Sequence, residues 1–143
     1  MKKASKAMAF GTFDILHPGH RYYLREAKKQ ATSLVVVVAR DATVLKVKRK
    51  PPVNNEQERV RNLRKLGIAD RVILGNPGDK YQVIKREKPD LLCFGYDQSH
   101  ITKGIGGELK RRGISPRIVR IVAYKPHIYK SSKLREGKSK NIK

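Results

Sequence analysis

The sequence has few of the features that mark membrane, secreted or metal-binding proteins. No apolar run approaches the roughly 18 residues that a membrane span needs, and the lysine-flanked start lacks the apolar stretch of a signal peptide. Cys93 is the only cysteine, so an intrachain disulfide and a cysteine-rich zinc site are excluded. Since Cys93 lies in the apolar run 91–94, we expect it to be an inert core residue. These absences predict a soluble, cytoplasmic protein that does not bind membranes.

Acidic residues are also scarce. The 34 lysines and arginines outnumber 12 aspartates and glutamates, which gives a formal net charge of +22. A basic surface attracts polyphosphates of any kind. The charge, however, is spread from Lys2 to Lys143, and no aromatic residues that would stack on bases are interleaved with it. We therefore expect small anionic substrates and no dedicated nucleic-acid partner. A basic nucleic-acid-binding module without catalysis remains the alternative of a different class.

The length of 143 residues suits one domain with a moderate core. We expect this domain to span residues 1–136 and to be followed by a basic flexible tail, residues 137–143. The sequence leaves the oligomeric state open, a homodimer included.

Apolar, strand-like runs alternate with helical patterns along the chain. The expected strands are 7–10, 34–39, 71–74, 91–95 and 117–122. The expected helices are 18–31, 41–48, 81–87 and 107–112, together with a helix that Asn54 or Asn55 caps and that runs to about residue 66. We expect residues 104–107 to form a flexible connection. The alternation predicts an α/β fold: a single Rossmann-like three-layer α/β/α domain with a five-stranded parallel sheet. Ligands bind such sheets beyond the carboxyl ends of the strands, where the strand order reverses.

The most informative segment is GTFDILHPGH, residues 11–20, which joins the first strand to the first helix. Pro18 suits the first turn of a helix, whose unpaired N–H groups and dipole attract anions. His17 and His20, three residues apart, lie on one face of that turn. Gly19 has no Cβ, so a nucleotide can approach the backbone closely. The segment predicts a phosphate site, in which we interpret Asp14 as a loop brace.

Three later groups fall after predicted strands or in late loops. Asp97 follows the strand 91–95 and can bind ribose hydroxyls or a base amino group, although an Asx-turn or helix cap is the alternative. Tyr124 follows the last strand and can stack on adenine; the alternative is a solvated loop tyrosine. Lys130, Ser131 and Ser132 can hold β- and γ-phosphates, or simply cap a basic helix.

The ten-residue segment resembles the Gly-Thr-Phe-Asp-x-Leu-His-x-Gly-His signature of the cytidylyltransferase-like nucleotidyltransferases. Within that superfamily the chain is most similar to the archaeal FAD synthases, which adenylate FMN, over about residues 6–135. The short motifs that carry this resemblance are Val38-Ala39-Arg40-Asp41, Glu56-Gln57-x-Arg59, Ile73-Leu74-Gly75, Lys88-Pro89-Asp90, Gly95-x-Asp97-Gln98, Ile118-Val119-Arg120, Tyr124-Lys125 and Ser131-Ser132.

A glycerol-3-phosphate or ethanolamine-phosphate cytidylyltransferase is the nearest alternative. In cytidylyltransferases an Arg-Thr pair commonly precedes the serines of the second phosphate signature, whereas Tyr129-Lys130 stands here. This departure weakens the case for CTP.

The resemblance implies a set of substrate contacts. ATP would be bound by Thr12, Phe13, His17, Pro18, Gly19, His20, Asp97, Tyr124, Lys130, Ser131 and Ser132. A phosphate oxygen of FMN would attack the α-phosphorus in line, with His17 and His20 as the catalytic donors. A divalent ion, expected to be Mg²⁺, would be bound through the nucleotide phosphates. Of the candidates Lys46, Lys48 and Arg49, we favour Lys46 for the acceptor's phosphate; plain surface charge is the alternative for each of them.

Overall fold

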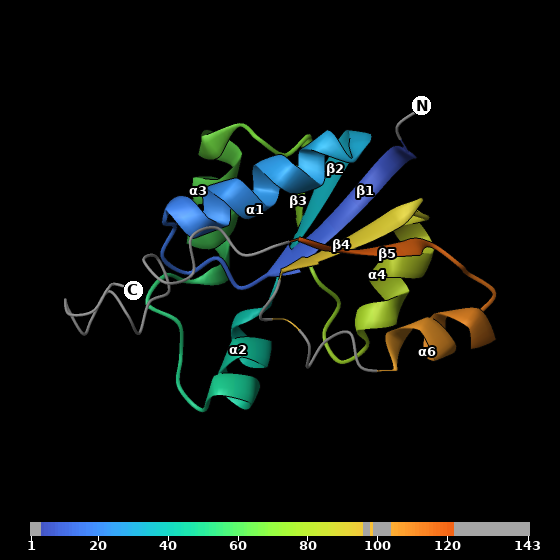
Figure 1. Cartoon of the computed structure of the whole chain (residues 1–143). Coiled ribbons are helices and arrows are strands. Elements are labelled where there is room, and N and C mark those ends of the chain that lie inside the picture. Colours follow the sequence, from blue (N-terminus) through green and yellow to red (C-terminus); the bar gives the residue numbers. More distant parts are fainter. Residues whose placement is uncertain (1–3, 96–97, 99–103, 122–143) are drawn as a thin grey trace, which may run out of the picture.

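A computed structural model describes residues 4–95, 98 and 104–121 of the chain. The elements follow in the order β1 (Ala4–Gly11), α1 (Pro18–Lys29), β2 (Ala31–Val38), α2 (Asp41–Lys48), α3 (Glu56–Leu66), β3 (Arg71–Leu74), α4 (Lys80–Glu87), β4 (Leu91–Gly95), α6 (Ile105–Arg111) and β5 (Arg117–Ile121) (Figure 1).

The five strands form one parallel sheet in the order β3-β2-β1-β4-β5, which confirms the predicted fold class. β1 begins three residues earlier than predicted, at Ala4 rather than Ala7. The first three residues of β1 do not belong to its apolar run. Ala4 nevertheless pairs with Ala31, and the Lys6 ammonium donates to the Glu87 carbonyl at 2.7 Å. Pairing with β2 therefore extends the strand beyond its apolar part.

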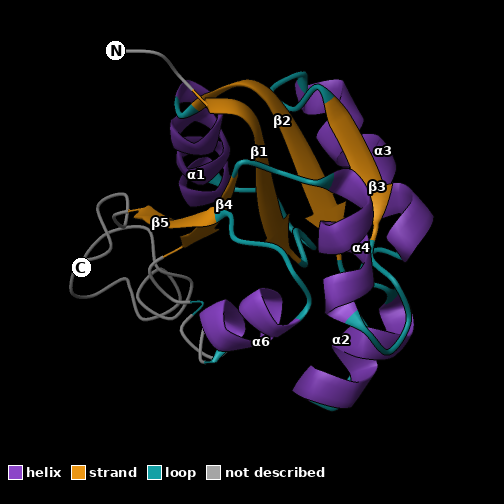
Figure 2. Cartoon of the chain, turned by 90° about the vertical axis from the view of Figure 1, so that its right-hand side faces the viewer, coloured by secondary structure: helices purple, strands orange, loops and turns teal. Residues whose placement is uncertain are grey.

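Helices cover both faces of the sheet, as the near-continuous apolar strands require. On one face, α1 and α3 contribute Leu24, Ala27, Val60 and Leu63 to a buried cluster with alternate residues of β1 and β2. On the other face, α4 and α6 pack their apolar residues against the remaining strand residues. α2 lies beyond the carboxyl ends of the strands (Figure 2).

The predicted flexible connection over residues 104–107 is wrong, because α6 begins at Ile105. Two glycines within a helix cost about 1 kcal/mol each relative to alanine. Ile105 and Leu109, however, are 2% and 1% exposed and belong to the buried cluster around Phe94. Burial of these two side chains offsets the poor helix propensity of Gly106 and Gly107.

Cys93 is fully buried in β4, and burial raises the pKa of its thiol to about 12. This confirms the prediction of an inert core cysteine. Among the residues that the structure describes, none of the helices combines the length and apolar character needed to cross a bilayer.

The sheet opens between β1 and β4. β1 stays paired with β2 as far as Gly11 and Val38, but its pairing with β4 ends at Ala9 and Cys93. The Tyr23 hydroxyl of α1 fills the gap, since it accepts from the Phe10 N–H at 3.2 Å and donates to the Cys93 carbonyl at 2.8 Å. This is the point where the strand order reverses, so the loop after β1 lies where ligands bind in such sheets.

Candidate functional site

The loop after β1 is fixed to the core by Phe13. This residue has a positive φ of 54° and is 3% exposed, with its ring in the core cluster beside Leu24. A Cβ on Gly11 would lie 2.8 Å from the Phe13 ring, so a larger residue at position 11 would displace it. Because the ring is buried, Phe13 can contact a nucleotide only through its backbone.

Asp14 braces this loop, as predicted. Its carboxylate accepts hydrogen bonds of 2.8 Å from the N–H groups of both Val53 and Asn54, and the Asn54 amide donates to the Asp14 carbonyl at 2.6 Å. Burial by itself would raise the pKa of Asp14, but the backbone donors and the Arg59 charge hold it below the ordinary value. Asp14 is thus an ionised structural anchor between the loop and the segment before α3.

A buried arginine ties the same loop to three other segments. Arg59 of α3 is 0% exposed and donates to the carbonyls of Asn54, Thr12 and Ala39 at 3.0, 3.0 and 2.7 Å. Its remaining terminal nitrogen contacts the Asp41 carboxylate at 2.6 Å. One guanidinium therefore sets the relative positions of the loop, the end of β2 and the first residue of α2.

The two histidines lie together at the start of α1. Their ring centroids are 4.0 Å apart with 29° between the planes. His17 caps the helix, because its Nδ1 accepts from the Gly19 N–H at 3.1 Å. A neutral ring with Nδ1 as acceptor carries its proton on Nε2. A Cβ on Gly19 would lie 2.9 Å from His17 Cε1, so glycine is needed here for the histidine ring.

His20 is held in its neutral form. Burial lowers the pKa of His20 to about 4, with further lowering by the charges of His17 and Lys48, against a raising effect of a hydrogen bond with the Ile15 backbone. Its Nδ1 is the one buried side-chain nitrogen or oxygen of the described chain that has no hydrogen-bond partner. An unpartnered buried polar atom of this kind is costly unless a ligand satisfies it.

The helix start itself differs from the expectation of unpaired donors. The N–H groups of Gly19, His20 and Arg21 are already engaged, the first with His17 Nδ1 and the other two with the His17 carbonyl at 2.9 and 3.2 Å. Pro18 has no N–H. The α1 terminus therefore contributes its dipole to an anion, while the imidazoles supply the hydrogen-bonding groups.

The remaining predicted site residues are only partly covered by the structure. Lys46 and Lys48 are exposed on α2, and the charge of Lys48 acts on His20. Outside the described residues lie Asp97, Tyr124, Lys130, Ser131 and Ser132.

Sequence reasoning missed three residues that position the site: Tyr23, Arg59 and Gln98. Gln98 donates to the Phe10 carbonyl at 2.8 Å and accepts from the Gly95 N–H at 2.7 Å, which joins the ends of β1 and β4. Arg59 and Gln98 belong to two of the short motifs that carry the family resemblance. The sequence signals for them are an arginine next to the apolar positions of a predicted helix and an amide shortly after a predicted strand.

Comparisons with known proteins agree with this geometry. The family model for cytidylyltransferase-like proteins matches residues 8–137. An FAD synthase of Aciduliprofundum boonei is 44% identical over 119 residues, which are 83% of this chain and 79% of that protein. An FAD synthase of Thermoplasma volcanium is 40% identical over 131 residues, 92% of each chain.

Among solved structures, a protein from Thermoplasma volcanium described as a lipopolysaccharide core biosynthesis protein has a TM-score of 0.80. It is 41% identical, and the match covers 85% of this chain and 99% of that one.

Proposed function

The chain belongs to the cytidylyltransferase-like family, and from that premise we propose that it is an FMN adenylyltransferase, which transfers the AMP group of ATP to FMN and releases pyrophosphate. The FAD synthase name of relatives at 40% and 44% identity supports both substrates. Within the fold, the observation that carries the proposal is the stacked pair His17 and His20, with an unsatisfied buried nitrogen, at the point where the strand order reverses.

The reaction needs donors rather than a nucleophilic side chain. The phosphate of FMN is ionised near neutral pH and attacks the α-phosphorus of ATP in line, so that a new P–O bond forms as the bond to pyrophosphate breaks. Negative charge spreads over the non-bridging oxygens. His17 and His20 are the groups that we assign to this charge, because preorganised donors in a fixed geometry stabilise it without reorganisation.

The protonation state of His20 follows from its surroundings. With a pKa of about 4, His20 is neutral in the free protein at pH 7. A triphosphate beside it would favour the charged imidazolium and raise this pKa, since an opposite charge within a few ångströms stabilises the charged form. Substrate binding would thus shift His20 towards the imidazolium, the form that donates from both ring nitrogens.

A divalent ion would be held mainly by the substrates. In the part of the chain that the structure describes, no three His, Cys, Asp or Glu side chains are grouped to hold a metal. The nearby carboxylates Asp14 and Asp41 are engaged with Val53, Asn54 and Arg59. This fits Mg²⁺, which keeps several waters and binds through phosphate oxygens. When bound, the ion would neutralise charge on the triphosphate.

Recognition of the two substrates is assigned to opposite sides of β1. For ATP, we propose Asp97 for the ribose hydroxyls or the adenine amino group, Tyr124 for adenine, and Lys130, Ser131 and Ser132 for the β- and γ-phosphates. Residues 12, 13, 18 and 19 would line the triphosphate. For FMN, we propose that Lys46 binds the phosphate.

A matrix of nucleoside triphosphates and phosphorylated acceptors tests the proposal. The purified protein is incubated with ATP or CTP and with FMN, glycerol 3-phosphate or ethanolamine phosphate, and the products are identified by mass. FAD and pyrophosphate should form only when ATP and FMN are both present. Turnover of CTP with a small phosphoalcohol, and none with FMN, would show that the acceptor is wrong.

A further inference from the structure

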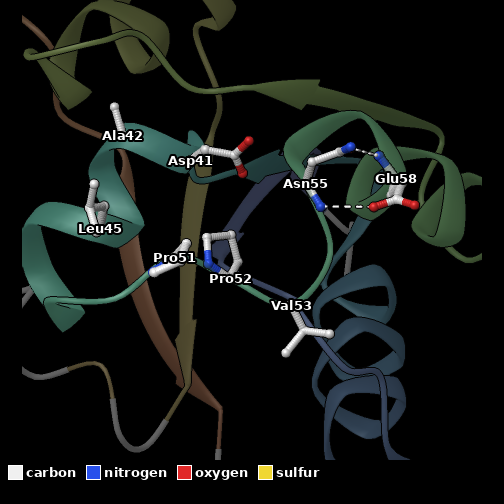
Figure 3. A pocket seen from close by; sticks show the side chains of 8 residues that line it. All are labelled: Asp41, Ala42, Leu45, Pro51, Pro52, Val53, Asn55 and Glu58. Atoms are coloured by element: carbon white, nitrogen blue, oxygen red, sulfur yellow. Dashed lines mark hydrogen bonds between the residues drawn. The ribbon is translucent and has the colours of Figure 1, made fainter.

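A hollow of about 350 Å³ lies between α2 and the loop that leads into α3 (Figure 3). We propose that it binds the planar, largely apolar isoalloxazine ring of FMN. This inference rests on the proposed function and adds to it a site for the part of the acceptor that does not react. The volume is within the range of small-molecule pockets, which are lined mainly by apolar side chains.

The hollow has an apolar lining that the fold itself does not use. Leu45 of α2 is 50% exposed and Val53 of the loop is 76% exposed, although both are large apolar residues. Ala42, Pro51 and Pro52 also line it, and Asp41, Asn55 and Glu58 are the polar residues of the lining. Single exposed apolar residues are ordinary. Several that line one hollow offer a surface that a flat ring can cover.

The loop that lines the hollow is fixed to the catalytic segment. The N–H of Val53 donates to Asp14, three residues before His17, and Arg59 joins the Asp41 carboxylate to the Thr12 carbonyl. The lining of the hollow is therefore joined by hydrogen bonds to the loop that leads to the histidine pair.

The position of the hollow suits the acceptor rather than adenine. α2 follows β2, on one side of β1, whereas the motifs assigned to the nucleoside follow β4 and β5, on the other side. In-line transfer brings the attacking oxygen to the α-phosphorus opposite the leaving pyrophosphate, so the acceptor needs a site separate from that of ATP. A hollow on the β2 side leaves the other side of β1 to the nucleoside.

The chain carries a run of cations next to the lining residues in sequence, and these suit the phosphate of an acceptor. The exposed cations Lys46, Lys48, Arg49 and Lys50 lie at the end of α2 and directly after it, before Pro51. A ring in the hollow and a phosphate near these cations would use both surfaces at once. Glycerol 3-phosphate would use the cations and leave the apolar lining exposed, so the hollow also gives a reason for preferring FMN.

The test is a set of matched serine substitutions, with separate KM values for FMN and ATP. Leu45→Ser and Val53→Ser each remove one apolar lining side chain from an exposed position, so the fold should be kept, which circular dichroism and thermal unfolding check. Val47→Ser is the control, since Val47 is 62% exposed on the same helix and does not line the hollow. Quenching of FMN fluorescence in the presence of Mg²⁺ and a non-hydrolysable ATP analogue gives the affinity directly.

We expect Leu45→Ser to raise the KM and Kd for FMN about tenfold, the factor for losing burial of half a leucine side chain or more. Val53→Ser should weaken FMN severalfold, and the KM for ATP and the control variant should stay near wild type.

Two results would overturn the inference. In the first, wild-type protein forms FAD but the lining variants keep the wild-type KM for FMN, or change only that for ATP; the hollow is then not the ring site, while the proposed function stands. In the second, wild-type protein forms no FAD from FMN and ATP, and both the function and the ring site are rejected.

Discussion

His17 and His20 belong to one short motif, yet their surroundings assign them different tasks. His17 accepts a hydrogen bond from the Gly19 N–H and caps α1, so its Nδ1 has a structural role. Burial lowers the pKa of His20, and its Nδ1 has no partner in the described chain. We therefore expect both histidines to contribute to catalysis, and His17 also to stabilise the start of α1.

Replacing either histidine by alanine should lower kcat about 10²- to 10³-fold, the usual effect of removing one preorganised donor. His17→Ala should also reduce the free energy of unfolding by about 1 kcal/mol, because the N-cap acceptor is lost. His17→Asn is the control, since asparagine can cap the helix but cannot replace the imidazole. Steady-state kinetics and urea unfolding measure the two effects. Near-wild-type turnover in both alanine variants would contradict the mechanism.

The depressed pKa of His20 predicts a pH-dependent stability. Below the unfolded value of 6.5 the unfolded chain takes up a proton, whereas folded His20 does so only near pH 4. Stability is therefore lost as the pH falls from about 6.5 to 4, by up to about 3 kcal/mol.

Urea unfolding at pH 7 and pH 4.5 tests this contribution. Wild-type protein should lose about 2 to 3 kcal/mol more than His20→Gln, which has no titratable group at this position. Carboxylates with lowered pKa, such as Asp14 and Glu87, also lose stability in acid but do so equally in both proteins. Equal losses in the two proteins would show that His20 titrates normally.

At the scale of elements, α3 and α2 act on the site from outside it. α3 is held by a reciprocal cap between Asn55 and Glu58, and it carries Arg59 into the interior. α2 is short and mostly exposed, with Val44 as its buried residue. α3 therefore fixes the catalytic loop through Arg59, and α2 presents charge and apolar surface to an acceptor.

Arg59→Leu should reduce the free energy of unfolding by about 3 kcal/mol or more. It leaves the carbonyls of Thr12, Ala39 and Asn54 without their donor in a buried setting. Arg61→Leu, at an exposed position of the same helix, is the control and should change stability by less than about 0.5 kcal/mol. Thermal and urea unfolding measure both. Similar small losses for the two variants would mean that the Arg59 contacts contribute little.

Two basic residues of α2 are expected to act on different properties, the affinity for FMN and the pKa of His20. Lys46→Ala should raise the KM for FMN about tenfold, as expected for loss of a charge-assisted hydrogen bond to phosphate. Lys48→Ala should raise the pKa of His20, because the Lys48 charge lowers it. Steady-state kinetics measures the KM for FMN, and an NMR titration measures the pKa of His20. An unchanged FMN affinity in Lys46→Ala would remove the role assigned to that lysine.

At the scale of the whole molecule, the net charge of +22 acts on any anionic substrate. Both ATP and FMN are anions, so long-range attraction should raise their local concentration. Because the Debye length falls from about 10 Å at 0.1 M salt to about 3 Å at 1 M, this attraction is screened by salt.

Raising salt from 0.05 to 0.5 M should therefore increase the KM for both substrates severalfold and leave kcat nearly unchanged. A neutral osmolyte at matched osmolarity is the control. Polynucleotide binding measured in parallel should be weak and lost at the higher salt. Affinity for a polynucleotide that survives 0.5 M salt would instead favour the nucleic-acid-binding alternative.

The sequence by itself determined the order of strands and helices, the inert Cys93, the site loop after β1 and the bracing role of Asp14. These follow from apolar periodicity, glycine and proline positions and one contiguous motif, all of which act over a few residues.

Only the tertiary structure decided that Ile105 starts a helix, that His20 is neutral with an unpartnered Nδ1, and that Arg59 reaches Thr12. Each depends on segments far apart in the chain, such as residues 12, 39, 54 and 59 around one guanidinium. The packing of distant segments sets the burial and the hydrogen-bond partners of these residues. Local sequence patterns do not indicate which distant groups come into contact.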